Sequence, residues 1–197
     1  MLEIPELIFA TNNQHKVSEV AAVLPAGIQI LTLKQAGIEA EMSEPYNTLE
    51  ANSLSKARQI AALSGKNCFA EDSGLEVEAL DNEPGVYSAR YAGEPRSDSA
   101  NIEKVLEKLG SSSNRKARFR TVIALILNGT EYLFEGECPG TIIHETRGTN
   151  GFGYDPIFVP DGFVTTFAEM DASAKNSISH RAIATGKLVA FFHKLMM

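Results

Sequence analysis

The amino-acid sequence predicts an α/β fold in which helices flank a long mixed central sheet. Three observations support this class. Short apolar runs typical of buried strands alternate with segments of helical periodicity, as in residues 7–11 and 16–24. Asn128-Gly129, the strongest short hairpin signal in the chain, joins two strand-like segments and predicts an antiparallel pair. The 197 residues, 44% of them hydrophobic, suffice for one large domain or two closely joined lobes.

The composition excludes several classes of protein. A net charge of −7 argues against binding nucleic acid through bulk electrostatics. Only two cysteines occur, without CxxC spacing, so a zinc site is not expected and a reduced, intracellular protein fits best. No run approaches the length of a membrane span, and the acidic start, residues 1–6, lacks the basic end of a signal peptide. We therefore expect a soluble, cytoplasmic protein that binds neither nucleic acid nor membrane.

The first strand, 7–11, leads through a polar loop, 12–15, into a helix over 16–24. Lys16 stands at the start of this helix. Backbone N–H groups at a helix N-terminus attract phosphate, and a lysine adds positive charge. The alternative is a plain connection with a solvated lysine, because no GxxxxGK[ST] pattern is present. A second strand is expected at 28–33.

An acidic loop over 39–45 precedes the next helix. Asn47 begins a pattern that resembles a capping box, so we expect it to cap a helix that runs to about Leu63. Asn52 and Lys56 lie one turn apart on this helix and share a face. The ordinary interpretation of Lys56 is a solvated charge.

The stretch around which the chain is organised is 69–75, Phe-Ala-Glu-Asp-Ser-Gly-Leu. Glu71 and Asp72 end a short apolar run, and open α/β sheets bind ligands outside strand ends. Carboxylates there hold Mg²⁺ or accept a proton from water. The alternative is a polar turn, because Asp-Ser-Gly is ordinary turn sequence. A half-buried strand is expected to follow over 75–79.

The middle of the chain predicts a helix and a hairpin. Asp98 is expected to cap a helix that runs to Leu109, with a glycine beyond its end. Residues 117–127 are β-branched and apolar, which indicates a central strand. Its hairpin partner is expected at 130–136, and the sheet continues to Ile143.

The stretch 146–155 combines three glycines with two aromatic residues. Glycines allow unusual backbone angles and the close approach of a ligand. Phe152 and Tyr154 offer ring faces on which a base can stack. The alternative is a flexible hairpin loop whose aromatic side chains fold onto the core. A short strand is expected at 156–159.

Near the C-terminus, Ser179 is expected to cap a last helix, whose apolar residues recur at helical spacing. Lys175, His180 and Arg181 gather at the start of this helix. The helix macrodipole disfavours cations at that end, which indicates that an anionic or electron-rich group binds there. The alternative for a lone histidine is a structural role.

Five motifs resemble, in order and spacing, those of the inosine triphosphate pyrophosphatase family, which hydrolyses inosine and xanthosine triphosphates and their deoxy forms. Each motif alone is weak, but five in order are specific, and together they span the chain from Leu7 to the last helix. The motifs are Thr11-x-Asn13-x-x-Lys16, Ala70-Glu-Asp-Ser-Gly-Leu75, Gly85-Val-Tyr-Ser-Ala-Arg-Tyr91, Gly151-Phe-Gly-Tyr-Asp-Pro-Ile-Phe158 and Ser179-His-Arg181.

The resemblance implies a single domain, 1–197, with two lobes around a substrate cleft. It also implies a homodimer, a requirement for Mg²⁺ and a small-molecule nucleoside triphosphate as the partner. The expected reaction converts ITP, dITP and XTP to the nucleoside monophosphate and pyrophosphate, which removes deaminated purines from the nucleotide pool.

The resemblance also assigns roles to residues of this chain. Asp72 is the general base, and Lys16 and Lys56 act beside it in catalysis. The metal ligands are Glu44 and Asp72, with Glu71 as a third candidate. The residues expected to bind substrate are Thr11, Asn12, Asn13, Gln14, His15, Lys16, Ser73, Phe152, Gly153, Tyr154, Asp155, Lys175, His180 and Arg181.

The chemistry of Arg181 predicts base choice. A guanidinium only donates hydrogen bonds, so it can bond the C6 carbonyl of hypoxanthine or xanthine but meets a second donor in adenine. Such a buried mismatch rejects the wrong base strongly.

Three alternatives stay open from sequence alone. One is a pyrophosphatase for another modified nucleotide, such as a methylated pyrimidine, against which the motifs at 152–155 and 179–181 argue. A second is a nucleotide sensor without turnover, which would have no need of Asp72. A third is an RNA-binding module, which the net charge of −7 disfavours.

Overall fold

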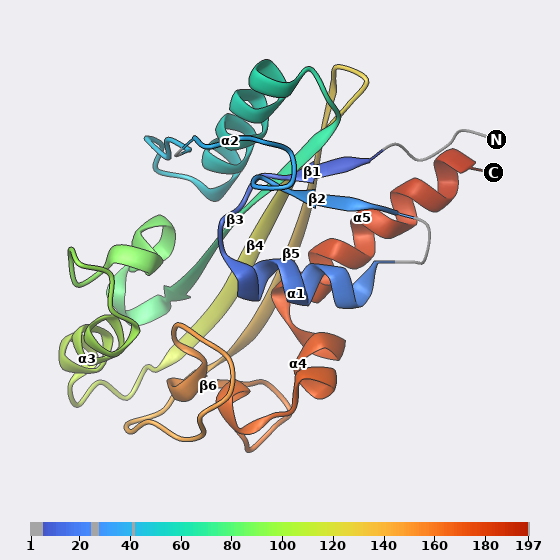
Figure 1. Ribbon diagram of the computed structural model, residues 1–197. Helices are drawn as coiled ribbons and strands as arrows, with labels where there is room; N and C mark the ends of the chain where they lie inside the picture. Colours follow the sequence, from blue (N-terminus) through green and yellow to red (C-terminus); the bar gives the residue numbers. More distant parts are fainter. Residues whose placement is uncertain (1–5, 25–27, 41, 197) are drawn as a thin grey trace. The chain divides into compact units, whose positions relative to one another are not determined.

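A computed structural model describes residues 6–24, 28–40 and 42–196 of this chain (Figure 1). The acidic start used in the signal-peptide argument lies largely outside them. The described residues form a six-stranded sheet in the order β2-β1-β3-β4-β5-β6. Strand β1 pairs in parallel with β2 and β3, whereas β5 and β6 are antiparallel, so the predicted mixed sheet is confirmed. The strands are β1 Leu7–Phe9, β2 Ile30–Thr32, β3 Cys68–Val77, β4 Lys116–Leu127, β5 Thr130–Ile142 and β6 Phe158–Pro160.

Five α-helices and four short 3₁₀ turns accompany the sheet in the described residues. None of these helices is both long and apolar enough to cross a membrane. The helices are α1 Gln14–Val23, α2 Leu49–Ser64, α3 Asp98–Leu109, α4 Ala172–Ile178 and α5 His180–Met196. The 3₁₀ turns are η1 Glu78–Leu80, η2 Gly85–Arg90, η3 Asp155–Ile157 and η4 Phe167–Glu169.

The chain folds into two compact units. Unit 1 comprises Met1–Asp72, Thr121–Gly136 and Arg181–Met197, and unit 2 comprises Ser73–Arg120 and Glu137–His180. Strands β3, β4 and β5 therefore contribute residues to both units. Two of the boundaries fall inside predicted functional motifs, between Asp72 and Ser73 and between His180 and Arg181.

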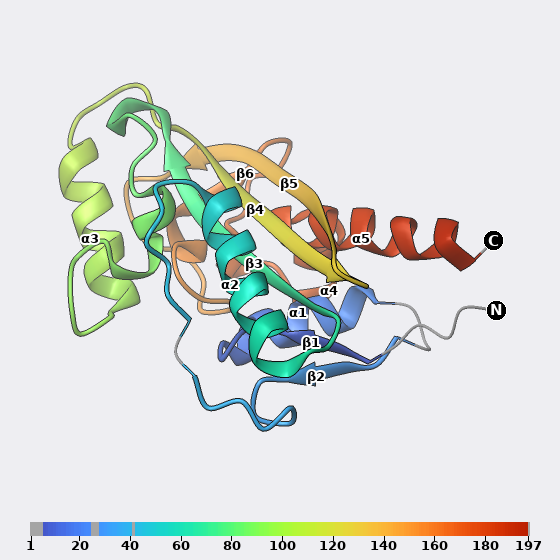
Figure 2. The same ribbon diagram turned by 90° about the horizontal axis from the view of Figure 1, so that it is seen from above.

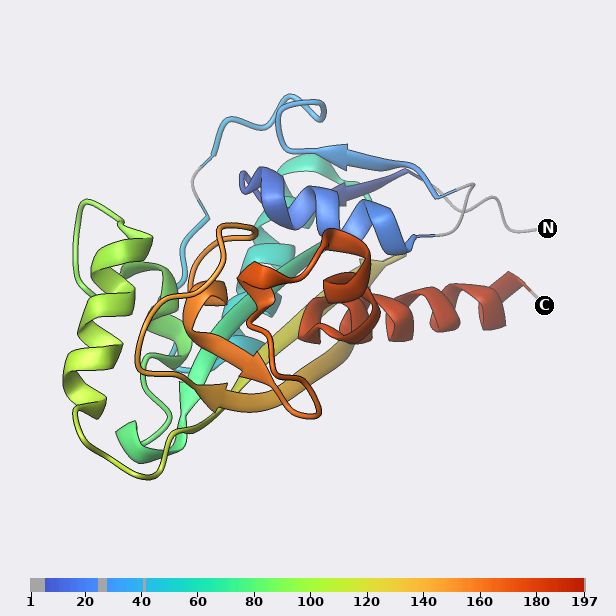
Figure 3. The same cartoon turned by 90° about the horizontal axis from the view of Figure 1, so that it is seen from below.

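Unit 1 has three layers, because successive residues of its strands face opposite sides. Leu7 and Phe9 of β1 pack with α1 and α5 on one face, and Ile8 packs with α2 on the other. Figures 2 and 3 show α1 and α5 on one side of these strands and α2 on the other. The rings of Phe9 and Phe69 stack at 4.4 Å between centroids and tie β1 to β3.

Unit 2 has its own aromatic core. The ring of Phe119 lies 4.7 Å from that of Phe158 and 5.9 Å from that of Phe167. Helix α3 buries Ile102 and Val105 in the same cluster. These contacts fix α3 within unit 2, where its first residue, Asp98, contacts the loop that contains Gly153.

The hairpin agrees with the prediction. Asn128 and Gly129 both have positive φ, at 51° and 79°, as a two-residue hairpin turn of the primed type requires. Cys68 and Cys138 are free and buried, and burial raises the pKa of each thiol to about 11.

Both the strand end expected at Glu71 and Asp72 and the alternative of a polar turn are wrong, because β3 runs without a break from Cys68 to Val77. Gly74 serves close packing instead. A Cβ atom at this position would lie 2.3 Å from the carbonyl oxygen of Gly85, so only glycine lets η2 approach the strand. The side chain of Ser88 in η2 also accepts the N–H of Leu75 at 2.9 Å.

Two helix caps differ by one residue from the prediction. Thr48, not Asn47, caps α2, since its side chain accepts the N–H of Ala51 at 3.2 Å. Ser97, not Asp98, caps α3 by accepting the N–H of Ala100 at 3.3 Å. The carboxylate of Asp98 is thereby directed to another partner.

The last third of the chain differs in two further respects. A separate helix, α4, precedes the last one, and the extended backbone of Ser179, with φ −68° and ψ 152°, divides the two. The strand expected at 156–159 begins only at Phe158, because η3 takes up the residues before it.

Candidate functional site

Strand β3 sends its two adjacent carboxylates to opposite faces of the sheet. Alternation along the strand directs Glu71 toward α1 and α5, and Asp72 toward α2. Two clusters of charged side chains result, both within unit 1. Neighbouring acids in the sequence therefore have different partners.

Glu71 forms the centre of the first cluster. Its carboxylate accepts from Lys16 Nζ at 2.9 Å and from Arg181 Nε at 2.8 Å. Arg181 also donates through Nη1 to Glu19 of α1. The guanidinium of Arg181 is only 2% exposed, so these two carboxylates balance a buried cation.

The charges of this cluster sustain one another. Burial disfavours the charge of Glu71, yet Arg181 and Lys16 hold its pKa well below the usual range. Burial likewise opposes the charge of Arg181, whereas Glu71 and Glu19 raise its pKa. Glu71 is therefore ionised at neutral pH, as an acceptor of two cations.

Lys56 of α2 forms the centre of the second cluster. Its Nζ donates to Glu44 Oε1 at 2.6 Å and to Asp72 Oδ1 at 2.9 Å. The lysine is 5% exposed, so the interpretation as a solvated charge is wrong. Burial disfavours its ammonium, but Asp72 and Glu44 raise its pKa above the ordinary value.

Asp72 differs electrostatically from its neighbour. Burial raises the pKa of Asp72 above its ordinary value, and attraction to Lys56 and Lys16 only partly offsets this effect. A carboxylate with a raised pKa is a better proton acceptor at neutral pH. In the absence of a metal ion, Asp72 is thus the more basic of the two neighbouring carboxylates.

The loop that carries Glu44 is fastened to α2 by Asn52. The amide of Asn52 accepts the N–H of Tyr46 at 2.9 Å and donates to the carbonyl oxygen of Tyr46 at 3.0 Å. Tyr46 lies two residues after Glu44. Asn52 and Lys56, which share a face of α2, therefore fix this loop and its carboxylate together.

The donor set around Lys56 fits a magnesium ion. Asp72 Oδ2 is buried and accepts no hydrogen bond within the described part of the chain. Those residues also contain no group of three or more His, Cys, Asp or Glu side chains placed to hold a metal. One or two carboxylates completed by substrate phosphates and water is the usual ligand set of Mg²⁺ at nucleotide sites. Glu44 and Asp72 match that set, whereas Glu71 is committed to its two cations.

The loop before α1 places the residues predicted to bind phosphate in unit 1. Asn13 caps the helix, and its Oδ1 accepts the N–H groups of His15 at 3.0 Å and Lys16 at 3.3 Å. Thr11 Oγ1 in turn accepts the N–H of Asn13 at 3.1 Å. Asn12, Gln14 and His15 are exposed. Two of the amides expected to attract phosphate are thus bonded to Asn13.

The glycine-rich loop of unit 2 is held by side-chain contacts, and the ring of Tyr154 lies in the core, as the alternative interpretation expected, rather than offering a free face to a base. The carboxylate of Asp155 accepts the N–H of Phe152 at 2.9 Å and the Nζ of Lys175 at 2.7 Å. Lys175 also lies over the Phe152 ring, 5.1 Å from its centroid. Tyr154 is buried and donates to the carbonyl oxygen of Ser88 at 2.8 Å.

Two other predicted residues belong to unit 2. His180 is buried and its ring stacks on Phe119, with 4.8 Å between centroids. Ser73 follows Asp72 in β3 and is half-buried. Unit 2 therefore carries Ser73, Phe152, Gly153, Tyr154, Asp155, Lys175 and His180, and unit 1 carries the other predicted residues.

The sequence analysis missed two residues that contact the site. Glu19 lies three residues after Lys16, so the two share a face of α1, and this spacing was the available signal. Asp98 accepts the N–H of Gly153 at 2.7 Å. Asp98 and Gly153 are far apart in the sequence, so no local sequence pattern predicts this contact.

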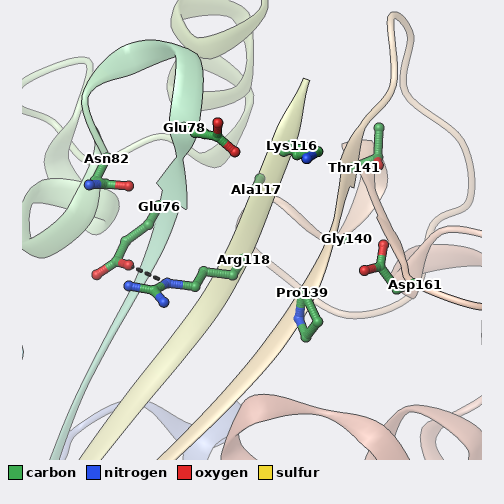
Figure 4. Close-up of a pocket in the computed structure, with 10 residues that line it drawn as sticks. All are labelled: Glu76, Glu78, Asn82, Lys116, Ala117, Arg118, Pro139, Gly140, Thr141 and Asp161. Atoms are coloured by element: carbon green, nitrogen blue, oxygen red, sulfur yellow. Dashed lines mark hydrogen bonds and ion pairs between the residues drawn. The ribbon is translucent and has the colours of Figure 1, made fainter. Parts of the chain in front are cut away.

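A depression of about 490 Å³ lies elsewhere on unit 2, across β3, β4 and β5 (Figure 4). Arg118 Nε donates to Glu76 Oε2 there at 2.7 Å. No predicted site residue lines this depression. Its lining residues are Glu76, Glu78, Asn82, Lys116, Ala117, Arg118, Pro139, Gly140, Thr141 and Asp161.

Comparison with known proteins identifies the family of this chain. The chain is 51% identical to a dITP/XTP pyrophosphatase of Porphyromonas gingivalis, covering 94% of this chain and 96% of the relative. It is 47% identical to a dITP/XTP pyrophosphatase of Christiangramia forsetii, over 96% and 100% of the two chains. The fold is similar to that of the Staphylococcus aureus Ham1 protein, with a TM-score of 0.89 at 39% identity, covering 97% of this chain and 100% of that one. The sequence model of the Ham1 family matches residues 7–191, and this chain therefore belongs to the Ham1 family.

Proposed function

We propose that this chain hydrolyses deaminated purine nucleoside triphosphates, namely ITP, dITP and XTP, to the nucleoside monophosphate and pyrophosphate. The observation that carries the proposal is the Asp72 carboxylate, which has one oxygen on Lys56 and a second, buried oxygen that accepts no hydrogen bond within the described residues. Relatives at 46–51% identity bear the name dITP/XTP pyrophosphatase, which supports the same reaction here.

In this mechanism a water molecule attacks the α-phosphorus in line with the leaving pyrophosphate. Asp72 accepts the proton of that water. Lys16 and Lys56 face the phosphates, where their charges stabilise the negative charge that grows on the leaving group. Asn13 shapes the loop before α1, and Thr11 supports Asn13 through its hydroxyl.

Glu44 and Asp72 would hold Mg²⁺ through their carboxylates. The ion would neutralise phosphate oxygens when bound. Glu71 has a different task in this proposal. Its carboxylate pairs with Lys16 and Arg181 and orients both side chains, so we do not assign it to the metal.

The nucleoside would be held by the loop from Phe152 to Asp155, with Lys175 and His180, and its base would be selected by Arg181. The carboxylates of Glu71 and Glu19 fix the guanidinium of Arg181 in one orientation. A donor group held in one orientation donates to a C6 carbonyl and discriminates against an amino group more sharply than a mobile donor does. Ser73, next to the general base, is a further contact.

We further propose that the chain works as a single pyrophosphatase domain, as a homodimer and in the cytoplasm. These three statements rest on the family resemblance and on the composition of the chain. The alternatives of another modified nucleotide as substrate, and of a sensor without turnover, are separated by the first experiment below.

The first prediction concerns substrate choice. Pyrophosphate release with Mg²⁺ is measured from ITP, XTP, GTP, ATP and a methylated pyrimidine triphosphate at equal concentrations. ITP and XTP should react at least about a hundredfold faster than ATP, because ATP leaves a donor facing Arg181. Preference for the pyrimidine would favour the other pyrophosphatase, and binding of ITP without pyrophosphate would favour the sensor.

The second prediction concerns the general base. Asp72→Asn should lower kcat for ITP by about 10²–10⁴-fold, because an amide cannot accept the proton of water. The protein should stay folded with a modest loss of thermal stability, since the Asn oxygen can still accept from Lys56 and Glu44 keeps its ion pair with that lysine. Asp161→Asn, at an exposed aspartate of unit 2, is the matched control and should keep normal kcat. A near-normal rate in Asp72→Asn contradicts the assignment.

The third prediction concerns base choice. Replacing Arg181 alone removes a cation that the buried Glu71 and the half-buried Glu19 both contact, which is destabilising. The informative variant is therefore Arg181→Gln combined with Glu19→Gln. A glutamine can present either a donor or an acceptor, so the ratio of kcat/KM for ITP over ATP should fall about tenfold or more.

The control for this variant is Arg58→Gln, which breaks an exposed arginine–carboxylate pair with Glu131 and should leave the ratio unchanged. Thermal unfolding is recorded for both proteins. If the folded double variant keeps the selectivity of the parent, Arg181 does not select the base.

A further inference from the structure

We infer that Asp98, at the start of α3, is a positioning residue that fixes the nucleoside-binding loop through the backbone N–H of Gly153. The contact itself is independent of function. Its consequence for substrate binding rests on the proposed function, which assigns this loop to the nucleoside.

The contact joins two segments of unit 2 that are remote in the sequence. Asp98 Oδ2 accepts the N–H of Gly153 at 2.7 Å. In Figures 1 and 3 the loop before β6 lies next to α3. A hydrogen bond to a carboxylate is shorter and stronger than one between neutral groups.

The carboxylate of Asp98 is available for this contact because another residue caps α3. Ser97 Oγ accepts the N–H of Ala100, which is the task that the sequence had suggested for Asp98. Asp98 is then the first helical residue, where the macrodipole also favours a negative charge. Its position is thus set by the helix rather than by the loop.

Helix α3 is a firm reference for the loop. Asn101, one turn after Asp98, accepts the N–H of Ala92 at 2.7 Å and donates to the carbonyl oxygen of Ala89 at 3.3 Å. Ile102 and Val105 are buried in the core of unit 2. Because α3 is held in this way, Asp98 has a defined position, and its hydrogen bond defines the position of the Gly153 N–H.

Gly153 is the point of the loop at which an external anchor has the most effect. Phe152 and Asp155 bond to each other across it, and Tyr154 is fixed to Ser88. Between them Gly153 has φ +60°, and a glycine exchanges between backbone conformations more readily than any other residue. Asp98 holds the N–H of this glycine from outside the turn.

A fixed Gly153 presets the direction of Phe152, whose ring we assign to the base. Substrate then binds to a loop that is already ordered, so the free energy of ordering the loop does not reduce the affinity. Loss of the anchor should therefore raise KM and leave kcat nearly unchanged, since Asp98 does not touch the groups assigned to the chemical step.

The test compares Asp98→Ala with Ser97→Ala. Both remove a favourable interaction at the start of α3, but only the first removes the bond to Gly153. In Asp98→Ala, hydrogen exchange of the Gly153 amide, followed by NMR, should accelerate about tenfold or more. KM for ITP should rise about tenfold with kcat within about twofold of the parent.

Asp98→Asn should recover much of both losses, because its amide oxygen can accept the same N–H. Ser97→Ala should lower the thermal stability yet keep the KM and the Gly153 exchange of the parent. Unchanged Gly153 exchange in Asp98→Ala overturns the inference, as does an equal rise of KM in Ser97→Ala.

Faster exchange with an unchanged KM would overturn the role in substrate binding. If no nucleotide is hydrolysed by the parent protein, the proposed function fails, and the exchange measurement still decides whether Asp98 fixes the loop.

Discussion

The pleat of strand β3 is the constraint on which the charged site of unit 1 depends. Because side chains alternate along a strand, Glu71 and Asp72 cannot share a partner on one face. Glu71 meets Lys16 and Arg181 at 2.9 and 2.8 Å, whereas Asp72 meets Lys56 at 2.9 Å. The two adjacent acids thus have different hydrogen-bonded partners, although Lys16 attracts both carboxylates. The continuous strand, rather than a turn, directs them to opposite faces.

Burial makes this separation consequential. Arg181 and Lys56 are 2% and 5% exposed, and a charge at such depth is tolerated only when it is paired and hydrogen-bonded. Each therefore has two carboxylate partners among the described residues, Glu71 and Glu19 for Arg181, and Asp72 and Glu44 for Lys56. The same pairing orients the groups, so charge balance and the preorganisation of a site for an anionic substrate have one physical origin.

Much of the fold was predictable, because hydrophobic periodicity and turn chemistry are local. The apolar run at β4 and the Asn128-Gly129 turn were sufficient to predict the hairpin. The order of the five motifs was sufficient to identify the family. The predicted helix caps differ by one residue from the observed ones, because Thr48 and Ser97 each have a neighbour, Asn47 and Asp98, that is an equally common N-cap residue. The partners of Glu71 and Asp98 were not predictable from local patterns. Arg181 and Gly153 come from distant segments, and only the fold brings them together.

The variant Glu71→Gln tests whether Glu71 pairs with Lys16 and Arg181 rather than binding the metal. Two quantities are measured, the free energy of unfolding and the Mg²⁺ concentration that gives half-maximal hydrolysis of ITP. We expect a loss of about 3–5 kcal/mol in stability, because the buried Arg181 and the half-buried Lys16 lose their shared carboxylate. We expect no change in the Mg²⁺ requirement. A protein of unchanged stability that needs about tenfold more Mg²⁺ would contradict this assignment and return Glu71 to the metal site.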